Sequence, residues 1–301
     1  MTKKMVLPMI LAVLFFWPHV GQGAESFRLT YDRAIQADGK GVKLLHPEGV
    51  AYRDKTFVVA DTGNGRLLRF VLTRGELDGG LVIVIPQAAR PMQVHFSSKG
   101  EILVLDGQSR RIVRLDAEGK VLGMVQPQGV PGGSTLMVRA FALDAEDNLY
   151  LLDLFGKRVI VTNPVGAFQR EIPLPKQGKA FADVALDPKG TVFVLDSVNA
   201  AVHAAARGAK TFSPLTNDLR QYATFPTNLT SDGRGGLLVV DRNGAGIVKI
   251  GQDGYYRGRQ LEMGWKAGLL YYPCQLCLTD NDEAVIADRD NNRVQIYRMA
   301  R

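Results

Sequence analysis

The side chains with the greatest potential for chemistry occupy one position of an internal repeat. When six repeat units are aligned on a recurring Asp, four of them carry an amide or a carboxylate at this position: Gln93, Asp183, Asn228 and Gln275. Glu48 directly precedes the position in the first unit. Carboxylate and amide oxygens suit calcium or magnesium better than zinc. The pattern predicts a site for a small ligand or a divalent cation such as calcium, with Asp183, Asn228 and Glu48 as candidate metal ligands.

Two residues further along each unit, on the same face of the strand, the sequence places His95 and Cys277. Both sets of side chains are expected to line a central channel, with His95 and Cys277 deeper than the first set. A second interpretation requires no ligand, because polar side chains cost little free energy in a water-filled channel. Both interpretations stay open at this point.

Cys274 and Cys277 form a C-x-x-C motif, and three familiar roles do not fit it. Haem attachment requires His where Leu278 stands, zinc requires more ligands, and a thioredoxin-like motif requires a helix after a strand. Residues three apart on a regular strand face opposite sides, so a disulfide requires a bulge. We expect buried free thiols in preference to a bridge.

Nucleophilic catalysis finds no support in the motifs of the chain. His46, His95 and His203 are the histidines beyond the first 24 residues, and no G-x-S-x-G accompanies them. The sequence also contains no phosphate loop and no dinucleotide-binding fingerprint.

The elements that position these side chains follow from the recurring Asp, which ends a short apolar run in every unit. It recurs at steps of 45, 47, 43, 45 and 47 residues: Asp61, Asp106, Asp153, Asp196, Asp241 and Asp288. A period of this length with several short strands per unit predicts propeller blades. The Asp itself is interpreted as a turn-forming residue that pairs with an Arg five residues later, because six copies on six blades favour a structural role.

The predicted fold is all-β, a six-bladed β-propeller of four-stranded antiparallel blades. Apolar runs such as 102–105 do not alternate with polar residues, which indicates strands buried on both faces. Blades are expected to begin near residues 46, 91, 138, 181, 226 and 272 of a single domain over 25–301. The last repeat lacks its outermost strand, and residues 27–34 are expected to supply it and close the ring.

Residues 1–24 have the pattern of a secretory signal peptide. Lys3 and Lys4 precede an apolar stretch from Met5 to Val20, and small residues follow at Gly21–Ala24. The chain is therefore expected to be exported to the periplasm or outside the cell, without a stable membrane span after cleavage; the alternative is an uncleaved anchor. Removal of two lysines with residues 1–24 lowers the formal net charge from +7 to +5, and the basic residues are spread over all blades, which argues against nucleic acid as a partner.

Loops that join successive blades carry aromatic residues and are expected to emerge beside the channel mouth. The aromatic residues in these loops are Tyr222, Phe225, Trp265, Tyr271 and Tyr272. Aromatic side chains on loops bury a large area at low entropy cost, and so indicate recognition of a partner. Capping of the blade ends is an equally simple explanation.

The units resemble the NHL-repeat family of six-bladed propellers. The resemblance rests on 47–51, on 59–66 and on 287–294, and it covers residues 45–301. Ala201 and Gly246 depart from the pattern where the paired Arg is expected. Relatives include binding scaffolds, lactonases and lyases. The resemblance to lactonase-like propellers implies a cation held by a Glu, Asn and Asp set, whereas a lyase-like zinc site requires more channel histidines than His95.

The predicted function is an exported scaffold that binds another exported or envelope protein, or a small ligand, at the face of the channel mouth. The alternative is a hydrolase or lyase that acts at the same mouth with a divalent cation. The sequence leaves open whether the protein is an enzyme.

Overall fold

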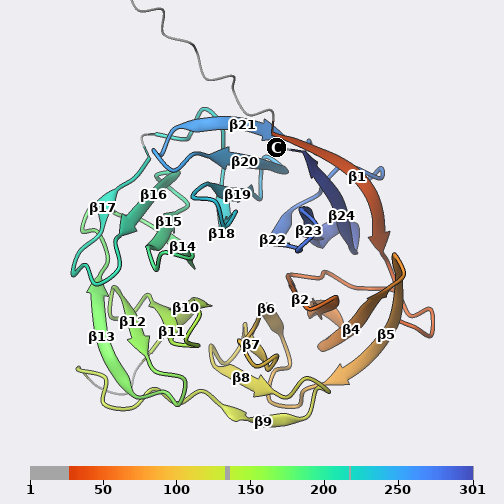
Figure 1. The fold of residues 1–301 in the computed structure, drawn as a ribbon, viewed down its shortest axis with the longest axis horizontal. Coiled ribbons are helices and arrows are strands. Elements are labelled where there is room, and N and C mark those ends of the chain that lie inside the picture. The colour runs from red at the N-terminus through yellow and green to blue at the C-terminus, as the bar shows by residue number, and fades with distance from the viewer. Residues whose placement is uncertain (1–26, 133–135, 217, 301) are drawn as a thin grey trace, which may run out of the picture.

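The computed structural model describes residues 27–132, 136–216 and 218–300. These residues form 24 strands in six antiparallel sheets of four, arranged as blades around a central axis (Figure 1). The fold class predicted from the sequence is confirmed. No helix in these residues is long and apolar enough to span a membrane. The predicted signal peptide at 1–24 lies outside the described residues.

Five blades run from the axis to the rim in chain order, and the last blade takes β1 as its outermost strand. The innermost strands are β2 (Gly49–Arg53), β6 (Pro91–Phe96), β10 (Val138–Leu143), β14 (Phe181–Leu186), β18 (Pro226–Ser231) and β22 (Pro273–Leu278). The second strands, which end in the repeated Asp, are β3 (Thr56–Asp61), β7 (Ile102–Asp106), β11 (Leu149–Asp153), β15 (Val192–Asp196), β19 (Leu237–Asp241) and β23 (Glu283–Asp288).

The third strands are β4 (Arg66–Thr73), β8 (Ile112–Leu115), β12 (Arg158–Thr162), β16 (Ala201–Ala205), β20 (Gly246–Ile250) and β24 (Arg293–Ala300). The outermost strands are β5 (Glu76–Val84), β9 (Val121–Met124), β13 (Phe168–Pro173), β17 (Ser213–Pro214), β21 (Tyr256–Gln260) and β1 (Arg28–Ile35). Single 3-10 turns, η1 (Thr62–Asn64) and η2 (Arg289–Asn291), follow the Asp in the first and last blades.

The ring closes because the first and last strands pair in one sheet. β1 lies antiparallel to β24, with Leu29 opposite Met299 and Tyr31 opposite Tyr297 (Figure 1). The rings of Tyr31 and Tyr297 meet edge to face at 6.1 Å. This pairing agrees with the closure expected from the sequence.

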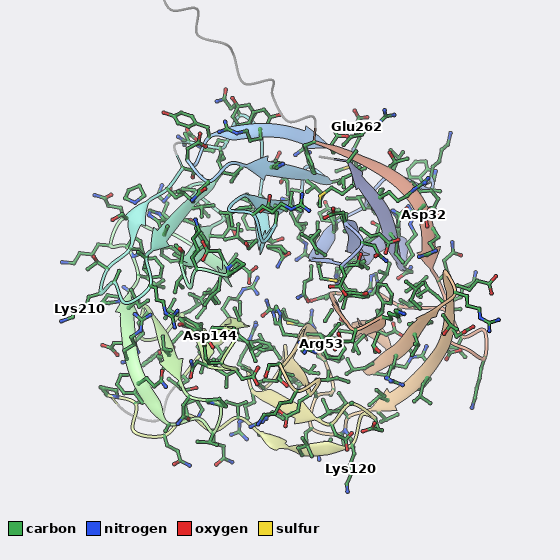
Figure 2. All side chains as sticks on the ribbon, viewed as in Figure 1. Asp32, Arg53, Lys120, Asp144, Lys210 and Glu262 are labelled. Carbon is green, nitrogen blue, oxygen red and sulfur yellow. The ribbon has the colours of Figure 1, made fainter. Side chains whose placement is uncertain are left out.

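The hydrophobic core is divided among the blade interfaces. In the described chain, six apolar clusters form, and each draws its residues from two neighbouring blades. The second strands are buried along nearly their whole length, as unbroken apolar runs require. Figure 2 shows how side chains fill the spaces between the sheets, while labelled residues such as Lys120 and Lys210 project from the rim.

The repeated Asp is a structural clamp. In every blade its carboxylate accepts a backbone N–H from the segment that enters the innermost strand, as Asp61 does from Leu45 at 2.7 Å and Asp288 from Tyr271 at 2.6 Å. Asp61 also pairs with Arg66 at 2.7 Å, the predicted partner five residues later. The predicted pairing with an Arg five residues later occurs in blades one, three and six, whereas in blade two no ion pair joins Asp106 and Arg111 in the described residues.

Blade five has no Arg five residues after its Asp, and a different arginine pairs with that Asp. Gly246 occupies the position opposite Asp241, and Arg259 reaches in from β21 to pair with that buried carboxylate at 3.0 Å. A Cβ at Gly246 would lie 2.5 Å from the Arg259 guanidinium carbon, so the glycine leaves the space that the arginine fills. In blade four no arginine takes this role, and Asn199 donates to Asp196 at 2.7 Å instead.

Replacing Arg259 tests whether it stabilises Asp241 in blade five as Arg66 stabilises Asp61 in blade one. Arg259→Ala leaves the buried Asp241 carboxylate without a cation, and we expect a loss of about 2 kcal/mol in the free energy of unfolding. Adding Gly246→Arg to that variant restores the pairing seen in blade one, and should recover most of the loss. Urea denaturation measures both effects. Arg257→Ala, an exposed neighbour on β21, is the control; an equal loss in the control would contradict the anchor role.

Candidate functional site

The predicted channel set forms a hydrogen-bonded ring at the axis. Asp183 accepts from Gln93 Nε2 at 3.2 Å and from Asn228 Nδ2 at 2.7 Å. Asn228 accepts from the backbone N–H of Leu276 at 3.0 Å. Gln275, the fourth member, bonds the backbone of blades one and two. We call Gln93, Asp183, Asn228 and Gln275 the axial ring.

The axial ring satisfies backbone groups of neighbouring blades by a repeated rule. Each member accepts an N–H one residue beyond the equivalent position of the next blade, as Gln93 does from Phe141 at 2.9 Å and Asp183 from Leu229 at 2.8 Å. Gln275 accepts from Val50 and Val94 at 3.2 Å each, and so serves two blades.

Two of these contacts skip a blade, and each skipped blade has a small residue. Gln93 reaches Asp183 past Ala140, and Gln275 reaches Val94 past Gly49. A Cβ at Gly49 would lie 2.4 Å from the carbonyl oxygen of Met92, so glycine is required there. The polar residues therefore join the inner strands, which supports the structural interpretation of this set.

The axial ring divides the channel into two chambers. Its four members line both a mouth cavity of about 60 Å³ and a deeper chamber of about 350 Å³. Glu48 and Cys274 belong to the mouth, while His95 and Cys277 belong to the deeper chamber, as does Arg53 near the axis (Figure 2). The predicted site residues are thus brought to one axis but not to one cavity.

Asp183 is the axial residue with the most unusual acidity. Burial raises the pKa of its carboxyl to about 6, although the N–H donors of Leu229, Val184 and Gln93 and the charge of Arg139 oppose the shift. Desolvation dominates because the carboxylate is almost fully removed from water. This group changes its protonation near neutral pH.

His95 does not resemble a ligand or a general base. Burial lowers the pKa of its imidazole to about 4, so the ring is neutral at physiological pH. The ring packs edge-on against Phe141 at 4.8 Å, and within the described chain Nε2 has no hydrogen-bond partner. The side chain fills the wall of the deeper chamber.

The mouth is built from β-bulges that the sequence alignment did not anticipate. In blades two to five the inner strand carries one extra residue just before the ring position, and blade six has a similar shift. The extra residues, which all line the mouth, are Met92, Arg139, Ala182 and Thr227. A bulge leaves its residue outside the regular pairing and redirects its side chain. The bulge thus turns Arg139 into the mouth.

Arginines dominate the electrostatics of the mouth. Arg139 and Arg242 line the cavity, and their side chains make no hydrogen bond or ion pair with any other residue that the structure describes. Burial lowers the pKa of Arg139, and the nearby Arg110 and Arg242 lower it further, while the carboxylates of Asp183 and Glu48 oppose the shift. Nη1 of Arg110 is itself buried without a partner in the described chain. Arg139 and Arg242 therefore face the mouth without a hydrogen-bonded or ion-paired partner in the described chain, and Arg110, which lines a separate cavity, lies near Arg139.

Glu48 is already engaged at the same mouth. Its carboxylate lies 3.1 Å from Nε of Arg289 and 3.5 Å from Nη2 of Arg90. Asp183 accepts several donors, and no group of three or more His, Cys, Asp or Glu side chains in the described residues has the arrangement of a metal site. In this structure the carboxylates of Glu48 and Asp183 are engaged by arginine and amide donors, and a cation held by Asp183, Asn228 and Glu48 stays a prediction.

The aromatic loop residues do not form one surface. Tyr222 stacks on Tyr256 at 3.7 Å and caps blades four and five, and Tyr271 meets Tyr272 edge to face at 5.1 Å. Trp265 is 79% exposed. Of the five predicted recognition residues, only Phe225 lines a cavity that adjoins the mouth. The capping explanation accounts for Tyr222.

Arg139 and Arg242 are the residues that sequence reasoning missed. Arg139 directly precedes the ring position of blade three, where Glu48 stands in blade one. Arg242 directly follows the repeated Asp, where Arg289 stands in blade six. An alignment extended to these two positions would have found both, because non-repeating charged residues stand out against the Met, Ala, Thr, Gly and Ser of other blades.

Comparison with solved structures supports the fold. The chain matches virginiamycin B lyase from Staphylococcus aureus with a TM-score of 0.63 at 13% identity, covering 91% of this chain and 99% of that one. It matches a gluconolactonase from Xanthomonas campestris, XC5397, with a TM-score of 0.65 at 15% identity, covering 91% and 89%. A Bacteroides thetaiotaomicron protein of unknown function gives a TM-score of 0.67 at 15% identity, covering 91% and 76%. These structures share the propeller fold of this chain.

No protein-family model and no curated protein matches the sequence. Identities of this size establish the fold alone. Membership of the NHL-repeat family stays a prediction, as does export.

The acidity of Asp183 makes the stability of the protein depend on pH. Because its folded pKa is raised above the ordinary value of 3.8, its contribution is complete below pH 4 and is lost as pH rises through about 6. We expect the free energy of unfolding of the wild type, minus that of Asp183→Asn, to fall by roughly 3 kcal/mol between pH 4 and pH 7. Urea titrations at several pH values measure this difference, and a flat profile would contradict the assignment.

The cysteines are free, as expected, although the inner strand does contain an irregularity. They lie in different chambers, and burial raises the pKa of Cys274 to about 12 and that of Cys277 further. We expect Ellman's reagent to react slowly with the native protein at pH 8 and to titrate two thiols per chain after unfolding. Absence of thiols in the unfolded, unreduced protein would show a disulfide instead.

Proposed function

We propose that this protein is an exported β-propeller that binds a small anionic ligand at its channel mouth. The proposal rests on one observation: the side chains of Arg139 and Arg242 line the mouth without a hydrogen-bonded or ion-paired partner in the described chain, and Arg110 lies close to Arg139. Unpaired guanidinium groups in a partly desolvated pocket carry a large free-energy cost unless an anion compensates them.

The chemistry of the mouth favours a carboxylate or phosphate group. Guanidinium groups bind both through paired N–H donors, and such charge-assisted hydrogen bonds are stronger than neutral ones. Glu48 forms an ion pair with Arg289 on the other side of the mouth, and this pair fixes the position of a further arginine. The axial ring forms the floor, which limits the ligand to the mouth and keeps it out of the deeper chamber.

Binding is favoured over catalysis because the groups of the mouth that could act as a nucleophile or a base are protonated or already engaged in hydrogen bonds. The Cys274 thiol is protonated at neutral pH, and Asp183 shares its oxygens with Gln93 and Asn228. Two of the structural neighbours are a virginiamycin B lyase and a gluconolactonase. A metal-dependent hydrolase or lyase is therefore the alternative that an experiment must separate from binding, and an exported or envelope protein is the alternative partner.

The proposal predicts binding that depends on the unpartnered arginines. Isothermal titration with citrate, phosphate and gluconate should detect at least one anion, with neutral glucose as the uncharged comparison. Arg139→Gln and Arg242→Gln should each weaken binding of that anion about tenfold or more, because each removes a charge-assisted hydrogen bond.

Arg257→Gln is the matched control, since Arg257 is paired with Asp253 on the rim strand and does not line the mouth. Equal affinity in all variants, or no anion binding, would contradict the proposal. Tight calcium binding that Asp183→Ala abolishes, together with lactone hydrolysis, would favour the enzyme.

A further inference from the structure

A large groove opens between blades three and four beside the mouth. It encloses about 890 Å³, a volume that suits a ligand of drug-like size. Its floor and walls are apolar and include Leu154, Leu174, Pro175, Phe181 and Phe225. We call this cavity the blade-three groove.

The lining of the groove is basic, and the carboxylates that act on Arg139, those of Asp183 and Glu48, lie outside it. Lys157, Lys176 and Lys179 line it together with Arg139, and its lining contains no Asp or Glu. All three lysines are exposed, and none forms an ion pair with another residue in 27–132, 136–216 or 218–300. An apolar cavity with basic side chains complements a ligand that is apolar over most of its surface and carries negative charge.

The groove is continuous with the mouth. Arg139, Ala182 and Thr227 line both cavities, and all three are the bulged residues of their inner strands. A ligand whose acidic group contacts Arg139 would therefore extend its remaining atoms into the groove. The bulges connect a charged site to an apolar one.

We infer that the ligand is an amphiphilic monoanion, such as an alkyl or aryl carboxylate, with its acid at Arg139 and its apolar body in the blade-three groove. This inference rests on the proposed anion site, and it adds the class of ligand.

The backbone around the groove argues for a small molecule over an extended peptide. A peptide that adds a strand requires free N–H and C=O groups along an edge. Here Leu174 donates to Lys157 at 2.9 Å, Gly178 to Pro175 at 3.0 Å and Ser197 to Ala180 at 2.9 Å. These bonds use backbone groups of the segments that form the groove. A ligand in the groove would therefore contact side chains.

Titration calorimetry with butyrate, hexanoate and decanoate tests the inference on the full mature protein. Affinity should rise about fourfold for each methylene that enters the groove, because each buried CH₂ contributes roughly the corresponding hydrophobic free energy. Decanol, which has the tail without the charge, should bind at least tenfold more weakly than decanoate. Phe225→Ser should lower decanoate affinity several-fold and leave butyrate affinity unchanged.

Phe155→Ser is the matched control, since Phe155 is an exposed phenylalanine on the neighbouring turn and is not part of the groove lining. Equal affinity for butyrate and decanoate, with both lost in Arg139→Gln, would overturn this inference and leave the anion site standing. Length-dependent binding that Arg139→Gln and Arg242→Gln do not weaken would overturn both proposals. An equal effect of Phe155→Ser and Phe225→Ser would also overturn the role of the groove.

Discussion

The structure depends on hydrogen-bond satisfaction at the axis. Six inner strands meet there, and each presents backbone N–H groups that have no further strand to pair with. The axial ring supplies the missing acceptors from side chains, one blade to the next, and Gln275 supplies two. Amides and a carboxylate at these positions are therefore a condition of closing the propeller around a narrow channel.

This constraint decides where a ligand can bind. Side chains that hold the inner strands together have few lone pairs left for a ligand, because their oxygens already accept hydrogen bonds from neighbouring blades. The residues outside the regular strand pairing are therefore the ones available to bind a ligand. The bulge at Arg139 and the turn position at Arg242 place charge at the mouth without disturbing the ring below. Scaffold and site use adjacent positions of the same strands.

Much of the fold was predictable because its signals are local. The repeated Asp and the unbroken apolar runs lie within one blade, and the closing strand was found because the last unit lacked one. The role of the axial ring was not predictable, since each bond joins blades about 45 or more residues apart. Arg259 illustrates the same limit: only the folded blade shows that it fills the space above Gly246. The groove was also not predictable, because it forms where the loop at 174–180 meets residues that are distant in the sequence, such as Phe225.

The joining of β1 to β24 has a consequence for the order of events in folding. Arg28 faces Ala300, so the contact that completes the last sheet spans nearly the whole polypeptide and carries a large loop-closure entropy. A nascent chain that has emerged only as far as β23 keeps β1 without a neighbour, and that strand then exposes an unpaired edge to other molecules. Assembly of the circle therefore waits until β24 has been synthesised, and any shortened product that ends before β24 is prone to associate with its own kind.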